Sequence, residues 1–259
     1  MKKMLITGGA SGIGFSLAKY YAKKSFDVTV LDKTIGGIEE FNSLHTSTQI
    51  EFQELDCTSW NDISRFCEDQ NESNRDFQVL INNVSPRHKI TLNEESEESW
   101  TDTVNGTLFP AFLLSRLMVD KVHSLDSARI INISSVVSVL AASQSFAYHA
   151  AKSGLESLTR KFANEAGDCH PNFTVNSIRL GFVVQERHLP MYNAAENTEY
   201  REKVSNYLPN HVLPGREIEI AQTIDFLIDE RSRFINGAQI TLDGGASVQE
   251  QFTLLLNRK

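Results

Sequence analysis

Tyr148 and Lys152 lie four residues apart in a stretch with a helical pattern, and their side chains are suited to proton transfer. On a helix this spacing puts them on one face, with Cβ atoms about 5–6 Å apart. A free phenol has a pKa of about 10, but a nearby ammonium stabilises the phenolate and lowers that pKa. The pair is therefore a candidate general acid/base. The spacing alone would also suit a surface tyrosine beside a solvated lysine.

A glycine cluster near the N-terminus could bind phosphate. Residues 7–14 read Thr-Gly-Gly-Ala-Ser-Gly-Ile-Gly, directly after a predicted strand and at the start of a predicted helix. Glycine lets the backbone approach a pyrophosphate that a Cβ would block. The N-terminus of a helix offers unpaired N–H groups and the positive end of its dipole. Because a strand precedes the cluster and a helix follows it, the motif predicts a dinucleotide-binding turn.

An acidic residue ends the second predicted strand. Asp32 lies eighteen residues after Gly14, an offset at which a carboxylate can accept hydrogen bonds from the adenosine ribose. A carboxylate there would repel a 2′-phosphate, so NAD(H) is favoured and NADP(H) is less expected. Asp32 could instead cap a helix or turn, and the neighbouring Lys33 could soften the discrimination.

Two serines follow the predicted strand that ends at Ile133. Ser134 and Ser135 would lie at the carboxyl end of that strand, where sheets of this kind bind ligands. A hydroxyl there could hydrogen-bond a substrate oxygen beside Tyr148. We interpret Ser134 as a turn residue. His149 is also interpreted as structural, because periodicity points it away from Tyr148.

Strand-like and helix-like patterns alternate along the whole chain. We expect strands at Met4–Ile6, Asp27–Leu31, Glu51–Leu55, Phe77–Ile81, Arg129–Ile133, Phe173–Ile178 and Gln239–Leu242. Several are apolar on both faces, as in a covered parallel sheet, and amphipathic patterns such as 12–24 and 147–166 fill the gaps. The alternation predicts an α/β fold, a doubly wound, Rossmann-like and mostly parallel seven-stranded sheet with helices on both faces.

The whole chain, 1–259, is expected to form one domain with a long excursion at about 185–215. A connection of that length is often a lid or binding loop, although it can be purely structural. Side chains that could contact a polar or anionic substrate, such as a sugar or hydroxy acid, are Arg87, His88, Arg187, His188, Met191 and Tyr192.

Composition excludes several classes of protein. Hydrophobic residues make up 41% and charged residues 22%, as in an ordinary globular protein. The net charge of −8 disfavours nucleic acid as a partner. Three widely spaced cysteines predict neither a disulfide framework nor a metal site, and they suit a reducing cytoplasm. No signal peptide and no apolar run of membrane-spanning length is recognised, so no membrane partner is expected.

Taken together, the motifs resemble the short-chain dehydrogenase/reductase family, in its single-domain branch, over nearly the full chain. Their order and spacing carry the resemblance: TGxxxGxG at Thr7–Gly14, Asp56, Asn82-Asn83, Asn105, Ser135, Tyr148-x-x-x-Lys152, Asn176 and Asp243-Gly244-Gly245. The longer sugar-epimerase branch has the different glycine spacing TGxxGxxG.

The resemblance implies a catalytic set and a cofactor site. Tyr148 would exchange a proton with the substrate, Lys152 would bind the nicotinamide ribose and lower the pKa of Tyr148, Ser135 would polarise the carbonyl, and Asn105 would hold a relay water. Hydride would pass directly from the cofactor, so no metal is expected. The implied cofactor-binding residues are Gly8, Ser11, Gly12, Ile13, Gly14, Asp32, Asp56, Cys57, Asn83, Tyr148, Lys152, Gly181 and Val183. Asp56 would meet the adenine ring, and the protein would form a homotetramer or homodimer.

The chain departs from the family pattern in three places. Val84-Ser85 replaces Ala-Gly, Leu180 replaces a proline before Gly181, and Gln185 replaces a threonine that commonly contacts the nicotinamide carboxamide. These departures keep an alternative open, a catalytically inactive NAD(H)-binding sensor or scaffold. A dehydration or epimerisation that retains the cofactor is a third possibility.

Overall fold

The computed structural model describes residues 2–45, 49–73, 76–86, 88, 91–209 and 213–249. Within these residues, seven strands form one parallel sheet in the order β3-β2-β1-β4-β5-β6-β7. Their bounds are β1 Lys3–Thr7, β2 Asp27–Asp32, β3 Ile50–Glu54, β4 Val79–Asn82, β5 Ala128–Ser135, β6 Phe173–Leu180 and β7 Gln239–Leu242. The predicted doubly wound fold is confirmed.

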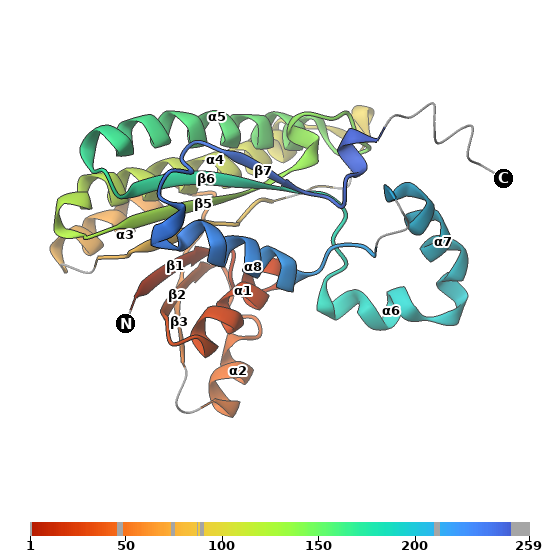
Figure 1. The fold of residues 1–259 in the computed structure, drawn as a ribbon, viewed down its shortest axis with the longest axis horizontal. Helices are drawn as coiled ribbons and strands as arrows, with labels where there is room; N and C mark the ends of the chain where they lie inside the picture. Colours follow the sequence, from red (N-terminus) through yellow and green to blue (C-terminus); the bar gives the residue numbers. More distant parts are fainter. Residues whose placement is uncertain are drawn as a thin grey trace.

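Helices cover both faces of the sheet (Figure 1). One apolar cluster joins the sheet to α1, α2 and α8, and a second joins its other face to α3, α4 and α5. The bounds of these helices are α1 Gly12–Lys23, α2 Ile38–Leu44, α3 Trp60–Glu72, α4 Glu97–Asp120, α5 Phe146–Cys169 and α8 Glu217–Ile228. Strands such as β4 are buried along their whole length because both faces are covered, which explains their continuous apolar sequence.

Strands β5 and β6 each run two residues further at their carboxyl ends than the sequence predicts. The predicted strand Arg129–Ile133 begins at Ala128 and includes both serines, because Ser134 and Ser135 pair with Arg179 and Leu180 of β6. The predicted end of β6 at Ile178 is extended by the same pairing. Ser134 is therefore a strand residue, and its interpretation as a turn residue was wrong.

Strand β1 lies between β2 and β4. From β1 to β3 the strands are added on one side of β1, and from β4 to β7 they are added on its other side. Parallel sheets bind ligands at such a switch point, outside the carboxyl ends of the strands. Here the turn after β1, the ends of β4 and β5 and the start of α5 all lie at that edge.

The long connection after β6 contains short helices. They are η4 Glu186–His188, α6 Leu189–Asn193, η5 Ala195–Asn197 and α7 Thr198–Tyr207. Its two ends are held together where Val183 bridges to Gly215, with hydrogen bonds of 2.9 and 3.1 Å across the bridge. The excursion therefore projects beyond the carboxyl end of β6, beside the ligand edge of the sheet (Figure 1).

Candidate active site

One cleft of about 1310 Å³ runs along the carboxyl edge of the sheet. It exceeds the roughly 300–1,000 Å³ usual for small-molecule sites, so it has room for a dinucleotide and a substrate. The structure brings most of the predicted site residues together in its lining. They are Gly8, Ser11, Gly12, Ile13, Asp32, Cys57, Asn83, Ser135, Tyr148, Lys152, Gly181 and Val183.

The glycine turn has the backbone that its sequence predicts. Gly8 and Gly12 adopt φ of 64° and 55°, in the left-handed region that disfavours side chains. A Cβ at Gly14 would lie 2.1 Å from the Gly8 carbonyl oxygen, so this position admits only glycine. Gly12 and Ile13 begin α1 and line the cleft, and the first N–H groups of a helix have no partner within it, so this turn is suited to a pyrophosphate.

Asn83 braces this turn from the end of β4. Its Nδ2 donates to the Gly8 carbonyl oxygen at 2.9 Å and to that of Thr7 at 3.2 Å. The backbone N–H groups of Asn83 and Val84 both donate to the Thr7 hydroxyl. Asn83 thus lines the cleft and also fixes the shape of the turn, a role that the sequence did not reveal.

Asp32 lies at the end of β2 and faces the same cleft. Its Oδ2 accepts from the Ala10 N–H at 3.0 Å and its Oδ1 from the Lys33 N–H at 2.8 Å. The Lys33 ammonium lies 3.1 Å from Oδ1 of Asp56. Lys33 also lines the cleft, and Asp56 pairs with its ammonium in a half-exposed ion pair.

Tyr148 and Lys152 share one face of α5, as their spacing predicts. The Lys152 ammonium lies 5.6 Å from the centre of the Tyr148 ring and donates to the Ile133 carbonyl oxygen at 2.8 Å. The Ser145 hydroxyl accepts from the Tyr148 N–H and caps the helix, and Glu95 accepts from the preceding N–H groups. These caps fix Tyr148 in the first turn of α5.

Ser135 ends β5 in the cleft lining, and a buried network supports its neighbours. The Ser134 and Ser138 hydroxyls both donate to Glu156, at 2.9 and 2.6 Å. Arg179 of β6 donates to both oxygens of the same carboxylate. Burial raises the pKa of the Glu156 carboxyl, but the hydrogen bonds from Arg179 and the serines outweigh it and lower the pKa.

Comparison with known proteins places this site in a family. The short chain dehydrogenase family model matches residues 2–191. The chain belongs to the short chain dehydrogenase family. It is similar to 3-oxoacyl-(acyl-carrier-protein) reductase FabG of Chlamydia trachomatis serovar D, 26% identical over 254 residues that cover 94% of this chain and 96% of the relative. It is also similar to 2-dehydro-3-deoxy-D-gluconate 5-dehydrogenase of Bacillus subtilis, 26% identical with 94% of each chain covered.

A solved structure shows the same architecture. That of 4-hydroxyisoleucine dehydrogenase complexed with NADH matches with a TM-score of 0.84 and 26% identity, covering 96% of this chain and 100% of that one. This short-chain dehydrogenase is therefore an oxidoreductase with a nicotinamide cofactor site on a Rossmann-like sheet.

Three implied site residues are not part of the described cleft lining: Gly14, Asp56 and Asn105. Gly14 packs beneath the turn, whereas Asn105 is half-buried on α4. The carboxylate of Asp56 accepts from the N–H and the hydroxyl of Thr58, at 2.8 and 2.7 Å. Burial raises the pKa of Asp56, but these bonds and Lys33 together lower it. In this geometry Asp56 orients Thr58, which itself lines the cleft.

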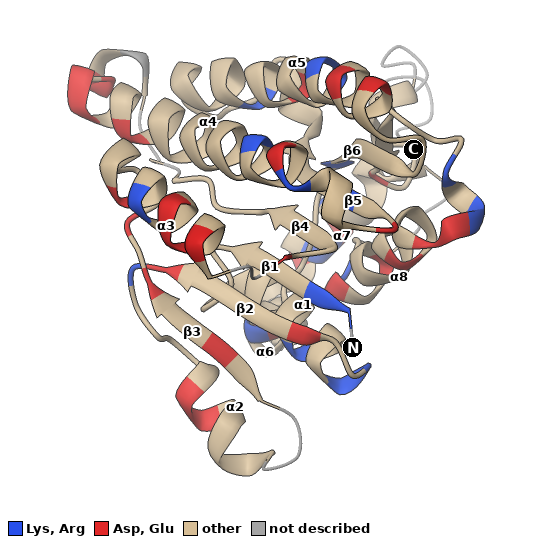
Figure 2. Cartoon of the chain, turned by 90° about the vertical axis from the view of Figure 1, so that its left-hand side faces the viewer, with Lys and Arg blue, Asp and Glu red and all other residues tan. Residues whose placement is uncertain are grey.

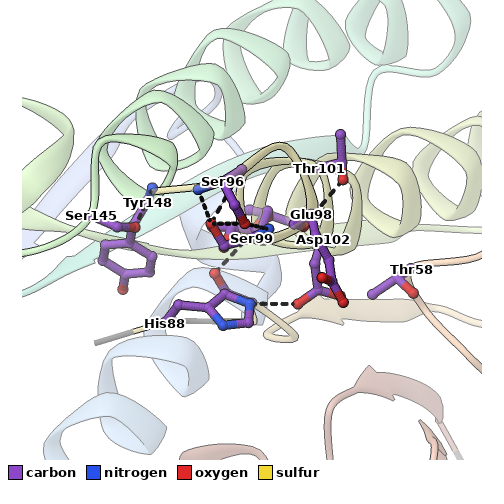
Figure 3. A network of polar contacts seen from close by, with 12 residues as sticks. Thr58, His88, Ser96, Glu98, Ser99, Thr101, Asp102, Ser145 and Tyr148 are labelled. Carbon is purple, nitrogen blue, oxygen red and sulfur yellow. Dashed lines mark hydrogen bonds and ion pairs between the residues drawn. The ribbon is translucent and has the colours of Figure 1, made fainter. Parts of the chain in front are cut away.

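The cleft near Tyr148 also holds residues that sequence reasoning partly missed. His88 Nε2 lies 2.9 Å from Asp102 Oδ2 of α4, and both line the cleft. Figure 3 shows the His88 ring between Tyr148 and Asp102. Arg87 falls outside the described residues.

The tyrosines that the excursion places in the cleft lining differ from the one that the sequence analysis named. Tyr200 and Tyr207 line the cleft, whereas His188, Met191 and Tyr192 are not in its lining. The Tyr192 ring instead packs edge-on against Tyr200, with centroids 6.2 Å apart. A helical spacing of seven links the two lining tyrosines, a signal that could have pointed to them.

The surroundings of His149 and Cys57 indicate structural roles for both residues. His149 accepts from the Ala142 N–H and contacts the Ser145 carbonyl oxygen, as its structural interpretation predicts. Burial raises the pKa of the Cys57 thiol to about 12, so at neutral pH it is not a thiolate nucleophile.

Among the described residues, no helix is long and apolar enough to cross a membrane, and no cluster of potential metal ligands is present.

Proposed function

We propose that this short-chain dehydrogenase interconverts an alcohol and a carbonyl with NAD(H), using Tyr148 as the general acid/base. The observation that carries the proposal is that Tyr148, with the Lys152 ammonium 5.6 Å from its ring, lines the same cleft as the glycine turn. A phenol beside an ammonium can exchange a proton at neutral pH, and the turn can bind the dinucleotide that accompanies this chemistry.

Each residue would have a role that follows from its position in the cleft. The bound nicotinamide would supply or accept the hydride. The glycine turn and the N-terminus of α1 would bind its pyrophosphate, and Lys152 would bind the nicotinamide ribose. Ser135 would hydrogen-bond the substrate oxygen, and Tyr148 would pass a proton to or from that oxygen. Asn105 would hold a water that connects Lys152 to solvent.

NAD(H) is favoured over NADP(H) because Asp32 lines the cleft and the ammonium of the adjacent Lys33 is paired with Asp56. A carboxylate at the adenosine ribose accepts hydrogen bonds from its hydroxyls and repels a 2′-phosphate. The similar 4-hydroxyisoleucine dehydrogenase is described as a complex with NADH, which supports the same cofactor here.

A polar substrate, such as a sugar or hydroxy acid, suits the substrate side of the cleft. The hydrogen-bonded side chains of His88 and Asp102 and the two tyrosines of α7 provide hydrogen-bonding groups there. The names of two similar proteins refer to a gluconate derivative and to hydroxyisoleucine, both polar. The name of a third refers to 3-oxoacyl groups on a carrier protein, so a 3-oxoacyl thioester belongs in any substrate panel.

The test is a spectrophotometric scan. Oxidation of NADH or reduction of NAD⁺ is followed with a panel of polar ketones, alcohols and a 3-oxoacyl thioester, and repeated with NADP(H). Turnover with NAD(H) supports the proposal. Tight binding of NADH without turnover across the panel would favour the inactive sensor, whose motivation is the substituted Val84, Ser85 and Gln185.

We further propose that the protein acts in the cytoplasm as a homotetramer or homodimer assembled through α4 and α5. Residues 103–115 of α4 contain no charged side chain, and the middle of this helix is uncharged in Figure 2. Such a face is suited to burial against a second copy.

A further inference from the structure

Arg187 lies at the glycine turn, on the cofactor side of the cleft. The Cβ position that Gly12 leaves empty lies 3.7 Å from Nη2 of Arg187 and 3.0 Å from Oε1 of Gln185. Both side chains reach the turn from the connection that follows β6, and both line the cleft. The guanidinium therefore lies near the N-terminus of α1, where its helix dipole already favours an anion.

Neither polar group finds a partner in the protein. Oε1 of Gln185 is buried and has no hydrogen-bond partner among the described residues. Arg187 makes no hydrogen bond or ion pair with any residue that the structure describes. A guanidinium has five N–H donors in a planar fork that matches phosphate oxygens. Arg187 is exposed, so its donors remain accessible to an anionic ligand bound at the turn. The buried acceptor of Gln185 points to a ligand that also donates.

The backbone that carries Arg187 is anchored to two helices. The Glu186 N–H donates to Oε1 of Glu217 on α8 at 2.7 Å, and the Glu186 carboxylate lies 3.4 Å from the Lys19 ammonium of α1. The His188 N–H donates to the Gln185 carbonyl oxygen at 2.8 Å. These contacts anchor the short helix η4, which carries Arg187, to α1 and α8.

We propose that Arg187 binds the pyrophosphate of the dinucleotide from the side opposite the glycine turn. This inference rests on the proposed function and adds a specific ligand to it. The excursion that forms the substrate side of the cleft thereby supplies a direct contact to the cofactor. Arg187 had been expected to contact substrate; its position at Gly12 instead assigns it to the phosphates.

The main experiment measures binding and does not depend on turnover, and the KM for an acidic substrate from the panel is measured beside it. Wild type, Arg187→Ala and Arg187→Lys are titrated calorimetrically with NADH, ADP-ribose and adenosine. Arg233→Ala is the matched control, because Arg233 is exposed and lies outside the cleft lining. Adenosine has no pyrophosphate, so it reports on the adenosine side of the site alone.

Loss of the guanidinium should raise the Kd for NADH and for ADP-ribose by roughly tenfold or more, the value of one charge-assisted hydrogen bond. The Kd for adenosine should not change. Arg187→Lys should give an intermediate Kd, because the ammonium keeps the charge and loses the fork. The affinity of wild type for NADH should also fall more steeply with added salt than that of Arg187→Ala.

Three outcomes would overturn the assignment. If Arg187→Ala binds NADH as wild type does, the guanidinium does not contact the cofactor. If the same variant also raises the KM for acidic substrates, Arg187 contacts the substrate instead. If adenosine binding weakens equally, the substitution acts by distorting the turn. Failure of wild type to bind either NADH or NADPH would instead overturn the proposed function itself, together with this inference.

Discussion

Tyr148 and Lys152 occupy neighbouring positions on one helix, yet the protein holds them by different means. The backbone N–H of Tyr148 donates to the Ser145 hydroxyl, which caps the helix. The Lys152 ammonium donates to the Ile133 carbonyl oxygen of β5. Both side chains are buried, at 9% and 2% exposure. The low exposure of the two side chains reduces the screening of the ammonium by solvent.

Removal of the phenolic hydroxyl tests this arrangement. Tyr148→Phe should lower kcat by roughly 10²–10⁴, the usual contribution of a positioned acid/base, and leave the Kd for NADH largely unchanged. Steady-state kinetics and calorimetry measure the two quantities. Near-normal turnover in this variant would refute the assignment of Tyr148.

Asp32 is expected to set the preference between the two dinucleotides. Asp32→Ala should weaken NADH binding and lift the repulsion of a 2′-phosphate, so the ratio of kcat/KM for NADH over NADPH should fall by roughly tenfold or more. Lys33→Ala is the control and should change the ratio much less, because Asp56 already holds that ammonium. An unchanged ratio in Asp32→Ala would mean that Asp32 does not read the ribose.

The ion pair of Glu156 with Arg179 should contribute to stability in a pH-dependent way. The pKa of Glu156 lies below its ordinary value of 4.5 because of Arg179 and two serines, despite burial. The contribution is therefore present above about pH 4.5 and is lost as the pH falls through the lower folded pKa. Urea unfolding of wild type should show this loss on acidification, and Glu156→Gln should lack that component.

The same substitution should cost about 3 kcal/mol at neutral pH, the lower end for breaking a buried pair, because Arg179 remains 19% exposed. Glu39→Gln on exposed α2 is the control and should be nearly neutral. Equal stability of Glu156→Gln and wild type at pH 7 would contradict a structural role for the pair.

At the scale of elements, the site depends on the turn after β1, which is held by Asn83 at the end of β4. The two strands are far apart in the sequence but are neighbours in the sheet. The turn after β1 takes its shape from three close-packed glycines and from Asn83 at the end of β4. The register of β1 with β4 places Thr7 opposite Asn82, which brings the next residue into reach of the turn. Parallel pairing thus converts a local motif into a rigid cradle.

Gly14→Ala should disrupt that cradle. Its Cβ would meet the Gly8 carbonyl oxygen at 2.1 Å, so the backbone must move. We expect a loss of measurable NADH binding with the sheet retained, as seen by calorimetry and far-ultraviolet circular dichroism. Gly167→Ala is the matched control, since a Cβ there meets only the Asn236 side chain, at 3.6 Å. Unaltered NADH affinity in Gly14→Ala would contradict the proposed cofactor turn.

At the scale of the whole molecule, the charges and apolar side chains are distributed unevenly. The net charge is −8, yet the middle of α4 is uncharged and carries Phe109 and Phe112 beneath the exposed Trp60 of α3. An apolar face of this kind on a charged protein suits an interface between copies of the chain.

Light scattering after gel filtration should therefore report a multiple of the 29.1 kDa chain mass. Trp60→Glu should shift the protein toward smaller species, because it puts a charge at the rim of this face. Leu44→Glu is the control, since Leu44 is 72% exposed on α2, in the opposite helix layer. A wild-type mass equal to one chain would contradict the proposed assembly.

The sequence by itself determined the fold class and the main chemical groups of the candidate site. Alternating apolar strands and amphipathic helices report burial directly, so the parallel sheet could be read from their order. A spacing of four fixes Tyr148 and Lys152 on one helix face, and a glycine turn between strand and helix has few conformations. These features are local, and local geometry follows from local sequence.

Only the tertiary structure decided which distant side chains meet. Asn83 reaches Gly8 across 75 positions, Arg179 reaches Glu156 from another strand, and Arg187 meets Gly12 from the excursion after β6. The tertiary structure also pairs Lys33 with Asp56, and it places Tyr200 and Tyr207, not the expected Tyr192, in the cleft lining. The direction of such side chains is set by the packing of elements far apart in the chain, which no spacing along the sequence encodes.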